Sequence, residues 1–288
     1  MEKLLTLFNL SGEIKRIKRE EDESFYDVYN VKTDEKEYII KKAKEYEAEI
    51  YSVFFKDEES SVPKIIDIKE YKNEKYILME KVEGESLIKC RRYLLKNTLD
   101  ALIKIQNKYW ENQEYKAAAY NFKISLESRI KRGKYLKDSL IEEYYEKFLQ
   151  IYKNVERTLC NDDLLPFNVI ANEKEAFIID WEFGGILPYL SSFSRLIAHG
   201  EEEETAFFYM KNEDKLFAIE YYYENLVKEK GIEYEKYRKD LSYFLLYEYC
   251  EWIMLGNKYE DTDRERFEKY KEMAFSIIKE IKLVDKLN

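Results

Sequence analysis

One short segment constrains the fold of this chain more than any other, because it joins a strand pattern to polar residues at fixed spacing. The apolar runs Val169-Ile170 and 177–179 flank the polar residues 172–175, and this arrangement predicts a β-hairpin. Asn168 stands directly before the hairpin, and Asp180 stands directly after it. The sequence therefore predicts a functional residue at each outer end of a small hairpin.

Asp163 extends this pattern, because it stands in a D-x-x-x-x-N arrangement with Asn168. Phosphoryl transfer requires mainly that the reacting groups are positioned and their charge is neutralised. One carboxylate accepts the proton of the attacking hydroxyl, and an amide with a second carboxylate supplies the hard oxygen ligands that Mg²⁺ favours. We therefore predict that Asp163 is the base or orients the hydroxyl, and that Asn168 and Asp180 bind Mg²⁺. Asp162 lacks the required spacing, and D-x-x-x-x-N without the hairpin is more often an ordinary turn.

The segment resembles the catalytic loop of the aminoglycoside phosphotransferase and choline kinase-like family. The usual form in that family is H-G-D-L-x-P-x-N followed by I-D-W-E. Residues 161–168 of this chain read N-D-D-L-L-P-F-N, and residues 179–182 read I-D-W-E. The resemblance implies an α+β, two-lobed protein kinase-like fold that binds ATP or GTP with Mg²⁺ between the lobes.

The expected domains are an N-terminal nucleotide-binding lobe at residues 1–82 and a C-terminal catalytic and substrate-binding lobe at residues 83–288. A chain of 288 residues is long enough for two such lobes, each with its own core. The first lobe is expected to hold a five-stranded antiparallel sheet with one helix, and the second is expected to be mostly helical. The strand-like runs lie at residues 12–17, 25–31, 37–41, 65–68 and 76–79, and helical spacing covers residues 44–55.

Lys41 ends the third predicted strand, where the resemblance implies a phosphate-binding lysine. Its expected ion-pair partner is a glutamate of the helix that follows. Glu47 shares a helical face with Ile50 and Phe54 and is the first choice, while Glu49 is the second. Without this context, a lysine at the end of a strand is usually a solvated surface residue.

Two further segments are expected to contact the nucleotide. The turn at residues 20–24 contains no glycine, although phosphate-binding loops favour glycine because its backbone approaches the anion closely. We expect Ser24 to offer its hydroxyl or N–H there. Beyond the sheet, residues 79–87 resemble the family's hinge, in which Met79 borders the purine and the Glu80 carbonyl and Val82 N–H bind the base edge.

Two residues depart from the family pattern around the catalytic loop. Asn161 replaces the usual histidine, and Ser191 stands where the family's supporting aspartate is expected. Asn161 still offers hydrogen bonds, so we expect a changed support for the loop and not an inactive enzyme by necessity. The only histidine, His199, follows apolar helical residues, and we interpret it as structural.

The acceptor pocket is expected between the catalytic loop and the C-terminal helices. Carboxylates and aromatic rings there suit a polyamine through charge, or an onium ion through cation–π contacts. Each of these residues is also explained by an amphipathic helix with a buried and a wet face. The substrate-binding candidates are Glu182, Tyr247, Glu248, Glu251 and Trp252.

Composition limits the partners and the compartment. A net charge of −10 disfavours nucleic acid and suits a cationic substrate, although mixed Glu and Lys also simply keep a surface solvated. The chain has no apolar run of membrane-spanning length and no signal-peptide pattern, so we expect a cytoplasmic protein without membrane contact. Cys90, Cys160 and Cys250 are widely spaced and are interpreted as buried free thiols.

These observations predict a kinase that transfers the γ-phosphate of ATP or GTP to a hydroxyl of an amino-sugar or aminoglycoside-like substrate. Two alternatives stay open. One is a choline/ethanolamine- or sugar-type metabolic kinase with a small cationic or polyhydroxy substrate. The other is a catalytically weak pseudokinase that acts as a binding protein, which the glycine-free turn with Asn161 and Ser191 would favour. The acceptor, the nucleotide preference and the oligomeric state are left open by the sequence.

Overall fold

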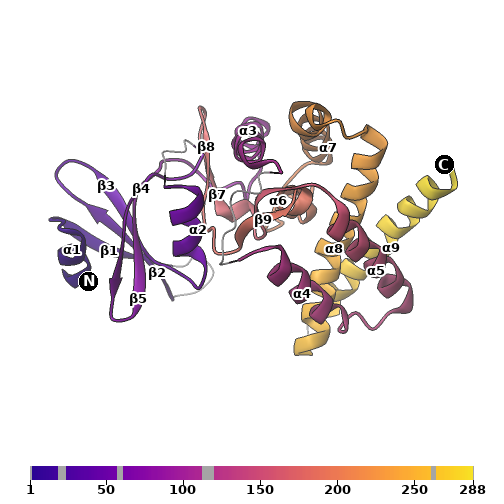
Figure 1. Ribbon diagram of the computed structural model, residues 1–288, viewed down its shortest axis with the longest axis horizontal. Helices are drawn as coiled ribbons and strands as arrows, with labels where there is room; N and C mark the ends of the chain where they lie inside the picture. The colour runs from indigo at the N-terminus through magenta and orange to yellow at the C-terminus, as the bar shows by residue number, and fades with distance from the viewer. Residues whose placement is uncertain (1, 19–23, 57–60, 112–119, 261–263, 288) are drawn as a thin grey trace.

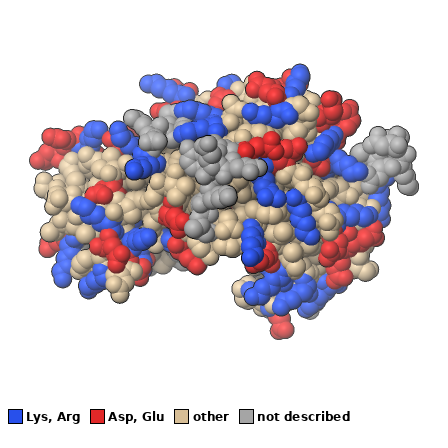
Figure 2. All heavy atoms as spheres, in the orientation of Figure 1, with Lys and Arg blue, Asp and Glu red and all other residues tan. Residues whose placement is uncertain are grey.

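The computed structural model describes residues 2–18, 24–56, 61–111, 120–260 and 264–287. The molecule is elongated, with a β-sheet at one end and a mainly helical part at the other (Figure 1). The N-terminus lies at the sheet end, and the C-terminal helix lies at the opposite end. On the face drawn in Figure 2, acidic and basic side chains are interspersed over both parts, which is typical of a solvated surface.

The sheet has five antiparallel strands in the order β1-β2-β3-β5-β4, as the sequence predicts. Short polar turns join β2 to β3 and β4 to β5, and the chain passes through a helix between β3 and β4. The strands are β1 (Glu13–Lys18), β2 (Phe25–Lys32), β3 (Glu37–Lys42), β4 (Ile65–Tyr71) and β5 (Glu74–Glu80).

Helices cover both faces of this sheet. Alternation along the strands places Ile40 and Leu78 on one face, where they pack with Phe8 of α1 (Glu2–Phe8). Ile77 lies on the other face and belongs to the same core as α2 (Glu47–Phe54). The expectation of one helix in this lobe is therefore wrong, because α1 is a second one. A helix of seven residues is too short to be stable alone, so its burial against the sheet is what stabilises it.

The hinge that leaves β5 is fixed to the second lobe by backbone contacts. Glu85 and Ala171 exchange two N–H···O bonds of 2.9 Å each. Gly84 precedes them with a φ of 155°, and a Cβ there would lie 2.6 Å from the Ala171 carbonyl oxygen. Only glycine allows this close approach of the two backbone segments. The hinge is therefore tied directly to the predicted hairpin.

The second lobe is mostly helical, as predicted. Leu95, Leu99 and Leu102 of α3 are completely buried, so this apolar side of the helix packs into the core. The helix α8 packs against both α5 and α6 near the centre of this lobe. The helices are α3 (Arg92–Tyr109), α4 (Phe122–Gly133), α5 (Ser139–Asn154), α6 (Leu190–Ala198), α7 (Asn212–Tyr222), α8 (Tyr234–Tyr259) and α9 (Arg264–Leu287).

Two small strand pairs lie between the lobes. The predicted hairpin is present as β7 (Val169–Ala171) and β8 (Ala176–Ile178), with Ile170 opposite Phe177. The Asn172 side chain closes its turn by accepting the N–H groups of residues 174 and 175. A second pair joins β6 (Arg157–Asn161) to β9 (Gly184–Pro188), and it places the catalytic loop beside the residues that follow the hairpin.

Two expectations about the whole chain can be compared with the described residues. Cys90, Cys160 and Cys250 are free and buried, as predicted. Within the ranges that the structure describes, none of the helices is both long and apolar enough to cross a lipid bilayer.

Candidate active site

The loop that carries Asp163 is held by hydrogen bonds on both sides. The Asp163 N–H donates to Asn161 Oδ1 at 3.0 Å. The Asp163 carbonyl oxygen accepts from Asn168 Nδ2 at 2.8 Å and from the Leu165 N–H at 2.7 Å. A short 3-10 turn over Pro166–Asn168 completes the loop. The backbone at Asp163 is thus fixed independently of its carboxylate.

Asp180 follows β8 in the left-handed backbone region, with a φ of 56°. Aspartate tolerates this region better than most residues, because its short side chain forms local hydrogen bonds. Asn161 Nδ2 donates to the Asp180 carbonyl oxygen at 3.1 Å, and the Ile179 N–H donates to the Asn168 carbonyl oxygen at 2.9 Å. Asn161 therefore connects the Asp163 loop to the Asp180 segment, as its expected hydrogen-bonding capacity predicts.

A serine of α6 supports the loop. Ser192 Oγ accepts the Asn161 N–H at 2.8 Å and donates to the Asn161 carbonyl oxygen at 3.1 Å. Ser191, at the position where the family's aspartate is expected, has a buried Oγ without a hydrogen bond among the described residues. The support for the loop therefore comes from the residue after that position, in line with the expected change of support. One residue rotates a side chain by about 100° around a helix axis, so only one of the two hydroxyls reaches the loop.

Lys41 connects the sheet to Asp180. Its Nζ lies 2.6 Å from Glu47 Oε1 and 2.9 Å from Asp180 Oδ1. Glu47, the first choice from the sequence, is fully buried on α2 and makes the expected ion pair. Glu49, the second choice, is partly exposed on the same helix. Lys41 thus joins three elements that are far apart in sequence.

Burial and neighbouring charges shift the pKa values of these carboxyl groups. Burial opposes ionisation of Asp180, but Lys41 and Lys44 together outweigh it and lower the pKa of Asp180. Burial raises the pKa of Glu47 in spite of Lys41. Burial also raises the pKa of Asp163, although Arg195 acts in the opposite direction. Asp180 is therefore the most readily ionised of these three carboxyl groups.

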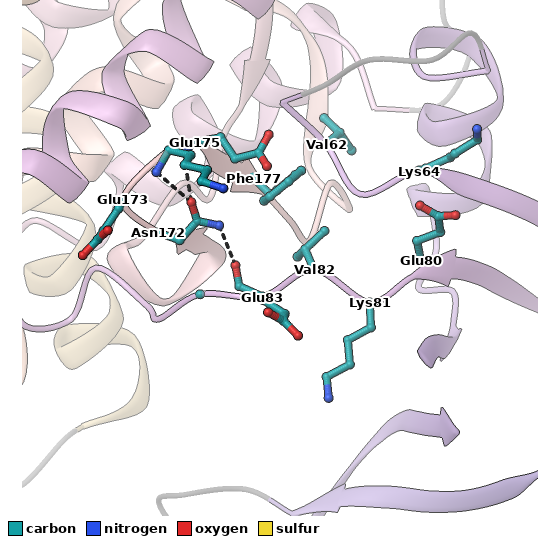
Figure 3. Close-up of a pocket in the computed structure, with 12 residues that line it drawn as sticks. Val62, Lys64, Glu80, Lys81, Val82, Glu83, Asn172, Glu173, Glu175 and Phe177 are labelled. Atoms are coloured by element: carbon teal, nitrogen blue, oxygen red, sulfur yellow. Dashed lines mark hydrogen bonds between the residues drawn. The ribbon is translucent and has the colours of Figure 1, made fainter. Parts of the chain in front are cut away.

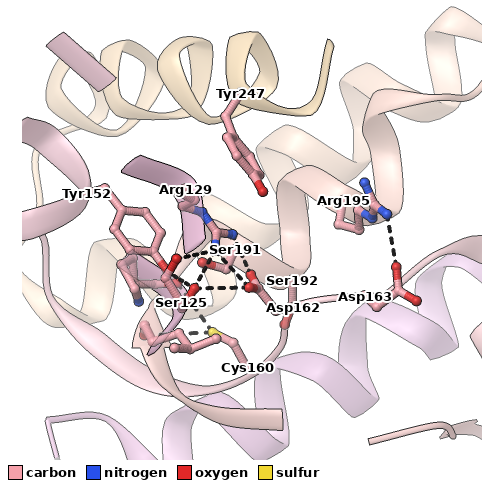
Figure 4. Close-up of polar contacts among 12 residues, drawn as sticks. Ser125, Arg129, Tyr152, Cys160, Asp162, Asp163, Ser191, Ser192, Arg195 and Tyr247 are labelled. Carbon is pink, nitrogen blue, oxygen red and sulfur yellow. Dashed lines mark hydrogen bonds and ion pairs between the residues drawn. The ribbon is translucent and has the colours of Figure 1, made fainter. Parts of the chain in front are cut away.

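Arg195 of α6 is a charged neighbour of Asp163 that the sequence did not indicate (Figure 4). Its Nη2 lies 2.9 Å from Asp163 Oδ1, and its Nη1 lies 2.9 Å from Glu248 Oε2 and 2.5 Å from Glu251 Oε2. Arg132 also pairs with Glu251. These contacts link the predicted base to α8 through a buried chain of alternating charges.

This network changes the interpretation of the predicted substrate-binding residues on α8. Tyr247 is buried with its ring stacked on Phe148. Glu248 and Glu251 are buried and neutralise Arg195, so their geometry favours a structural task over contact with a substrate cation. Trp252 stacks on the ring of Tyr270, which also lies beside the buried His199. The interpretation of His199 as a structural residue agrees with this packing.

Asp162, which the sequence excludes as the base, belongs to a separate buried cluster (Figure 4). Arg129 of α4 forms two hydrogen bonds with it, at 2.7 Å to Oδ1 and 2.9 Å to Oδ2. Oδ2 also accepts from the Tyr120 hydroxyl at 2.6 Å and from Ser125 Oγ at 3.1 Å. Asp162 thus fixes the catalytic loop to α4, a task that spacing in the sequence does not reveal.

Lys44 is a second cation at Asp180 that the sequence did not indicate. Its Nζ lies 3.2 Å from Asp180 Oδ2 and 3.0 Å from Glu182 Oε2. Glu182, predicted to bind substrate, therefore lies next to the expected metal ligand Asp180. Its contact with a substrate stays a prediction.

The glycine-free turn and the hinge are the two other segments that are expected to contact the nucleotide. Residues 20–23 of the glycine-free turn lie outside the described residues, and Ser24 is described as exposed. At the hinge, a cleft of about 820 Å³ is bordered by Glu80 and Val82 on one side and by Phe177 on the other (Figure 3). Neither the buried Met79 nor the charged centre at Asp180 lines this cleft. The contacts of Ser24, Met79, Glu80 and Val82 with a nucleotide remain predictions.

The donor set around Asp180 fits Mg²⁺ only together with a phosphate-bearing ligand. Among the described residues, no three His, Cys, Asp or Glu side chains are grouped in a way that would hold a metal. Asp180 offers a carboxylate, and Asn168 offers an amide oxygen while its Nδ2 is bonded to the loop. Mg²⁺ commonly takes one or two protein ligands of this kind and completes its shell with phosphates and water. The residues therefore fit a nucleotide-bound magnesium ion.

Comparison of the whole fold with solved structures places this geometry in context. No family model and no curated protein sequence matches the chain. The amicoumacin kinase hAmiN, in complex with AMP-PNP, Ca²⁺ and Ami, matches 99% of this chain and 93% of its own, with a TM-score of 0.67 and 14% identity. This chain shares the fold of a small-molecule kinase.

Further solved structures with this fold include two other types of kinase. A choline/ethanolamine kinase family protein from Mesorhizobium loti matches 95% of this chain and 91% of its own, with a TM-score of 0.62 and 12% identity. An aminoglycoside-3'-phosphotransferase of type VIII matches 86% of this chain and 98% of its own, with a TM-score of 0.59 and 15% identity. At these identities the likeness shows the fold, and the two-lobed kinase-like architecture predicted from the sequence is confirmed.

Proposed function

We propose that this protein is a small-molecule kinase that transfers the γ-phosphate of ATP or GTP to a hydroxyl of an amino-sugar or aminoglycoside-like acceptor. The observation that carries the proposal is the position of Lys41, whose Nζ bridges Glu47 and Asp180. In a phosphotransferase, this arrangement holds a phosphate-binding ammonium beside a metal-binding carboxylate. The Asp163 loop is fixed to the same Asp180 segment by Asn161.

Asp163 is the group that orients the acceptor hydroxyl and accepts its proton. Arg195 occupies Oδ1, and about a third of the Asp163 side chain (33%) is exposed, which leaves Oδ2 available to a hydroxyl. The arginine prevents rotation of the carboxylate, because turning it would break a charge-assisted hydrogen bond. The raised pKa of Asp163, caused by its burial, makes it a better proton acceptor than an exposed aspartate.

Asp180 and Asn168 are the residues that would hold Mg²⁺. The ion would neutralise phosphate charge and orient the γ-phosphate during transfer. Lys41, held by Glu47, donates to phosphate oxygens from the sheet side, and residues 80–82 of the hinge bind the base. In this proposal residues 1–82 bind the nucleotide, and residues 83–288 supply catalysis and the acceptor pocket.

The acceptor class has two candidates with separate support. The similarity to an aminoglycoside-3'-phosphotransferase favours an amino-sugar acceptor. The choline/ethanolamine kinase family protein favours a small amino alcohol. A net charge of −10 suits either cation. On α8, Glu248 and Glu251 are buried and already paired with arginines, so the partly buried Glu182, which pairs with the half-exposed Lys44, is the better candidate for substrate contact.

The test is a nucleotide-release assay with a panel of acceptors. Purified protein with Mg²⁺ is given ATP or GTP, crossed with aminoglycosides, amino alcohols and sugars, and ADP or GDP release is followed. We expect one acceptor class to stimulate release, and we expect Asp163→Asn to lower kcat by about 10²- to 10⁴-fold, as loss of a general base does. The matched control is Asp100→Asn, which changes an aspartate of α3 that pairs with Lys96 and is not one of the predicted site residues.

Two outcomes would contradict the proposal. Stimulated release that is equally fast in Asp163→Asn and the wild type would remove Asp163 from the mechanism. Nucleotide binding in the presence of Mg²⁺ without release for any acceptor would favour the pseudokinase alternative. A nucleotide thermal shift that Asp180→Ala abolishes would then show that the metal site is intact in a protein without turnover.

A further inference from the structure

Lys44 occupies an unusual position for a half-exposed lysine. Its side chain is 50% exposed, yet its Nζ contacts both Asp180 Oδ2 at 3.2 Å and Glu182 Oε2 at 3.0 Å. Lys41 Nζ holds the other oxygen, Asp180 Oδ1, at 2.9 Å. Two ammonium groups therefore flank the carboxylate that is expected to bind Mg²⁺.

Lys44 lies just before α2, and the first residue of that helix, Glu47, fixes its backbone. The Lys44 backbone N–H donates to Glu47 Oε2 at 3.3 Å, while Glu47 Oε1 accepts from Lys41 Nζ. A single buried glutamate thus fixes the side chain of one lysine and the backbone of the other. Both ammonium groups contact the Asp180 carboxylate, that of Lys41 at Oδ1 and that of Lys44 at Oδ2.

The balance of charges around Asp180 indicates a function for Lys44. Around Asp180, the three carboxylates of Glu47, Asp180 and Glu182 pair with two cations, those of Lys41 and Lys44. A magnesium-bound triphosphate is still an anion, so its arrival makes the excess of negative charge larger. Without Lys44, these three carboxylates would pair with Lys41 alone before the nucleotide binds.

The sequence of the segment expected to contact the phosphates makes the need for a cation greater. Residues 20–24 contain four acidic residues and no glycine, so the sequence lacks the usual means of bringing several backbone N–H groups to a phosphate. A flexible lysine supplies a mobile donor that replaces such contacts. Lys44 is suited to this because its long, half-exposed side chain has the reach to move from Asp180 and Glu182 to a neighbouring phosphate.

We propose that Lys44 is a second phosphate-binding lysine. With a nucleotide bound, the Lys44 ammonium would move from Asp180 and Glu182 to the terminal phosphates, and Asp180 would be left to hold the metal ion. This inference rests on the proposed kinase function, because it assumes that a nucleoside triphosphate binds beside Asp180. Lys44 thereby compensates for the glycine-free turn.

The test compares nucleotide affinity in variants of the full-length chain by isothermal titration calorimetry with Mg²⁺. Lys44→Ala is expected to weaken ATP binding by about 10- to 100-fold, the effect of losing a charge-assisted hydrogen bond, and to leave adenosine binding unchanged. Lys44→Arg keeps the charge and is expected to restore most of the affinity. The matched control is Lys42→Ala, because strand alternation turns Lys42 to the opposite face, where it pairs with Glu74 at 2.9 Å.

The outcomes separate this inference from the proposed function. Wild-type protein that binds ATP, with unchanged affinity in Lys44→Ala, would overturn the role of Lys44 alone. A lower Mg²⁺ requirement in Lys44→Ala at unchanged ATP affinity would also overturn it, because Lys44 would then only compete with the metal. Wild-type protein that binds neither ATP nor GTP would overturn both proposals. An equal loss of affinity for ATP and for adenosine in Lys44→Ala would indicate a general disturbance of the fold and would likewise contradict a phosphate contact.

Discussion

Replacing Asp162 by Asn removes one charge from a buried ion pair and keeps the volume of the side chain. The Asp162 carboxylate accepts two hydrogen bonds from Arg129 and one each from Tyr120 and Ser125. Burial opposes its ionisation, but Arg129 outweighs burial and lowers the pKa of Asp162, so the native carboxyl group is charged. In Asp162→Asn the guanidinium of Arg129 stays buried without its counter-ion.

The size of the effect follows from the burial of both partners. Removing one member of a buried ion pair typically costs about 3–5 kcal/mol of unfolding free energy. The guanidinium also lies 4.6 Å and 4.3 Å from the ring centroids of Tyr152 and Tyr247, and these aromatic faces keep part of the stabilisation. We therefore expect a loss near the lower end, about 3 kcal/mol.

Urea unfolding followed by circular dichroism measures this loss. With a urea dependence of about 3 kcal/mol per molar, the midpoint of Asp162→Asn is expected to fall by about 1 M. The double variant Asp162→Asn with Arg129→Met removes the orphaned charge and is expected to recover a large part of the loss. Glu143→Gln, which breaks an exposed pair with Lys147 on α5, is the control and should leave the midpoint unchanged. A shift in Asp162→Asn no larger than that of Glu143→Gln would refute the reasoning.

Two further predictions concern the network that links Asp163 to α8. Arg195→Gln is expected to lower kcat by about 10-fold or more with little change in the KM for nucleotide, because the Asp163 carboxylate loses its orienting partner. A rise in the nucleotide KM as large as the fall in kcat would contradict this prediction. Burial opposes ionisation of Glu251, but Arg195 and Arg132 outweigh burial and lower the pKa of Glu251. The stability that this carboxylate contributes is therefore fully present above the ordinary glutamate pKa of 4.5 and is lost as the pH falls below 4.5. Urea midpoints measured from pH 6 down to pH 3.5 should therefore fall more steeply for the wild type than for Glu251→Gln, and parallel profiles would refute the prediction.

The sequence by itself determined the elements whose signals are local. Alternation of apolar residues over short runs predicted the five strands and the hairpin of β7 and β8, and the D-x-x-x-x-N spacing singled out Asp163 with Asn168. Helical spacing on α2 distinguished Glu47 from Glu49 as the partner of Lys41, because two residues of separation turn a side chain to another face of a helix. The spacing of apolar residues depends only on residues that are close in sequence, so it can be recognised without a structure.

Only the tertiary structure decided which charges neutralise which. The pairs Arg129–Asp162, Arg195–Asp163 and Lys44–Asp180 join residues 33, 32 and 136 positions apart. A chain with 49 Lys and Arg and 59 Asp and Glu offers far more pairings than can form, and no spacing rule selects among them. Packing makes the selection, because it sets both the distance between two groups and their exclusion from water, which together determine the strength of an ion pair. The same reason explains the choice of Ser192 over Ser191, since the rotation of α6 against the catalytic loop depends on the helices packed around it.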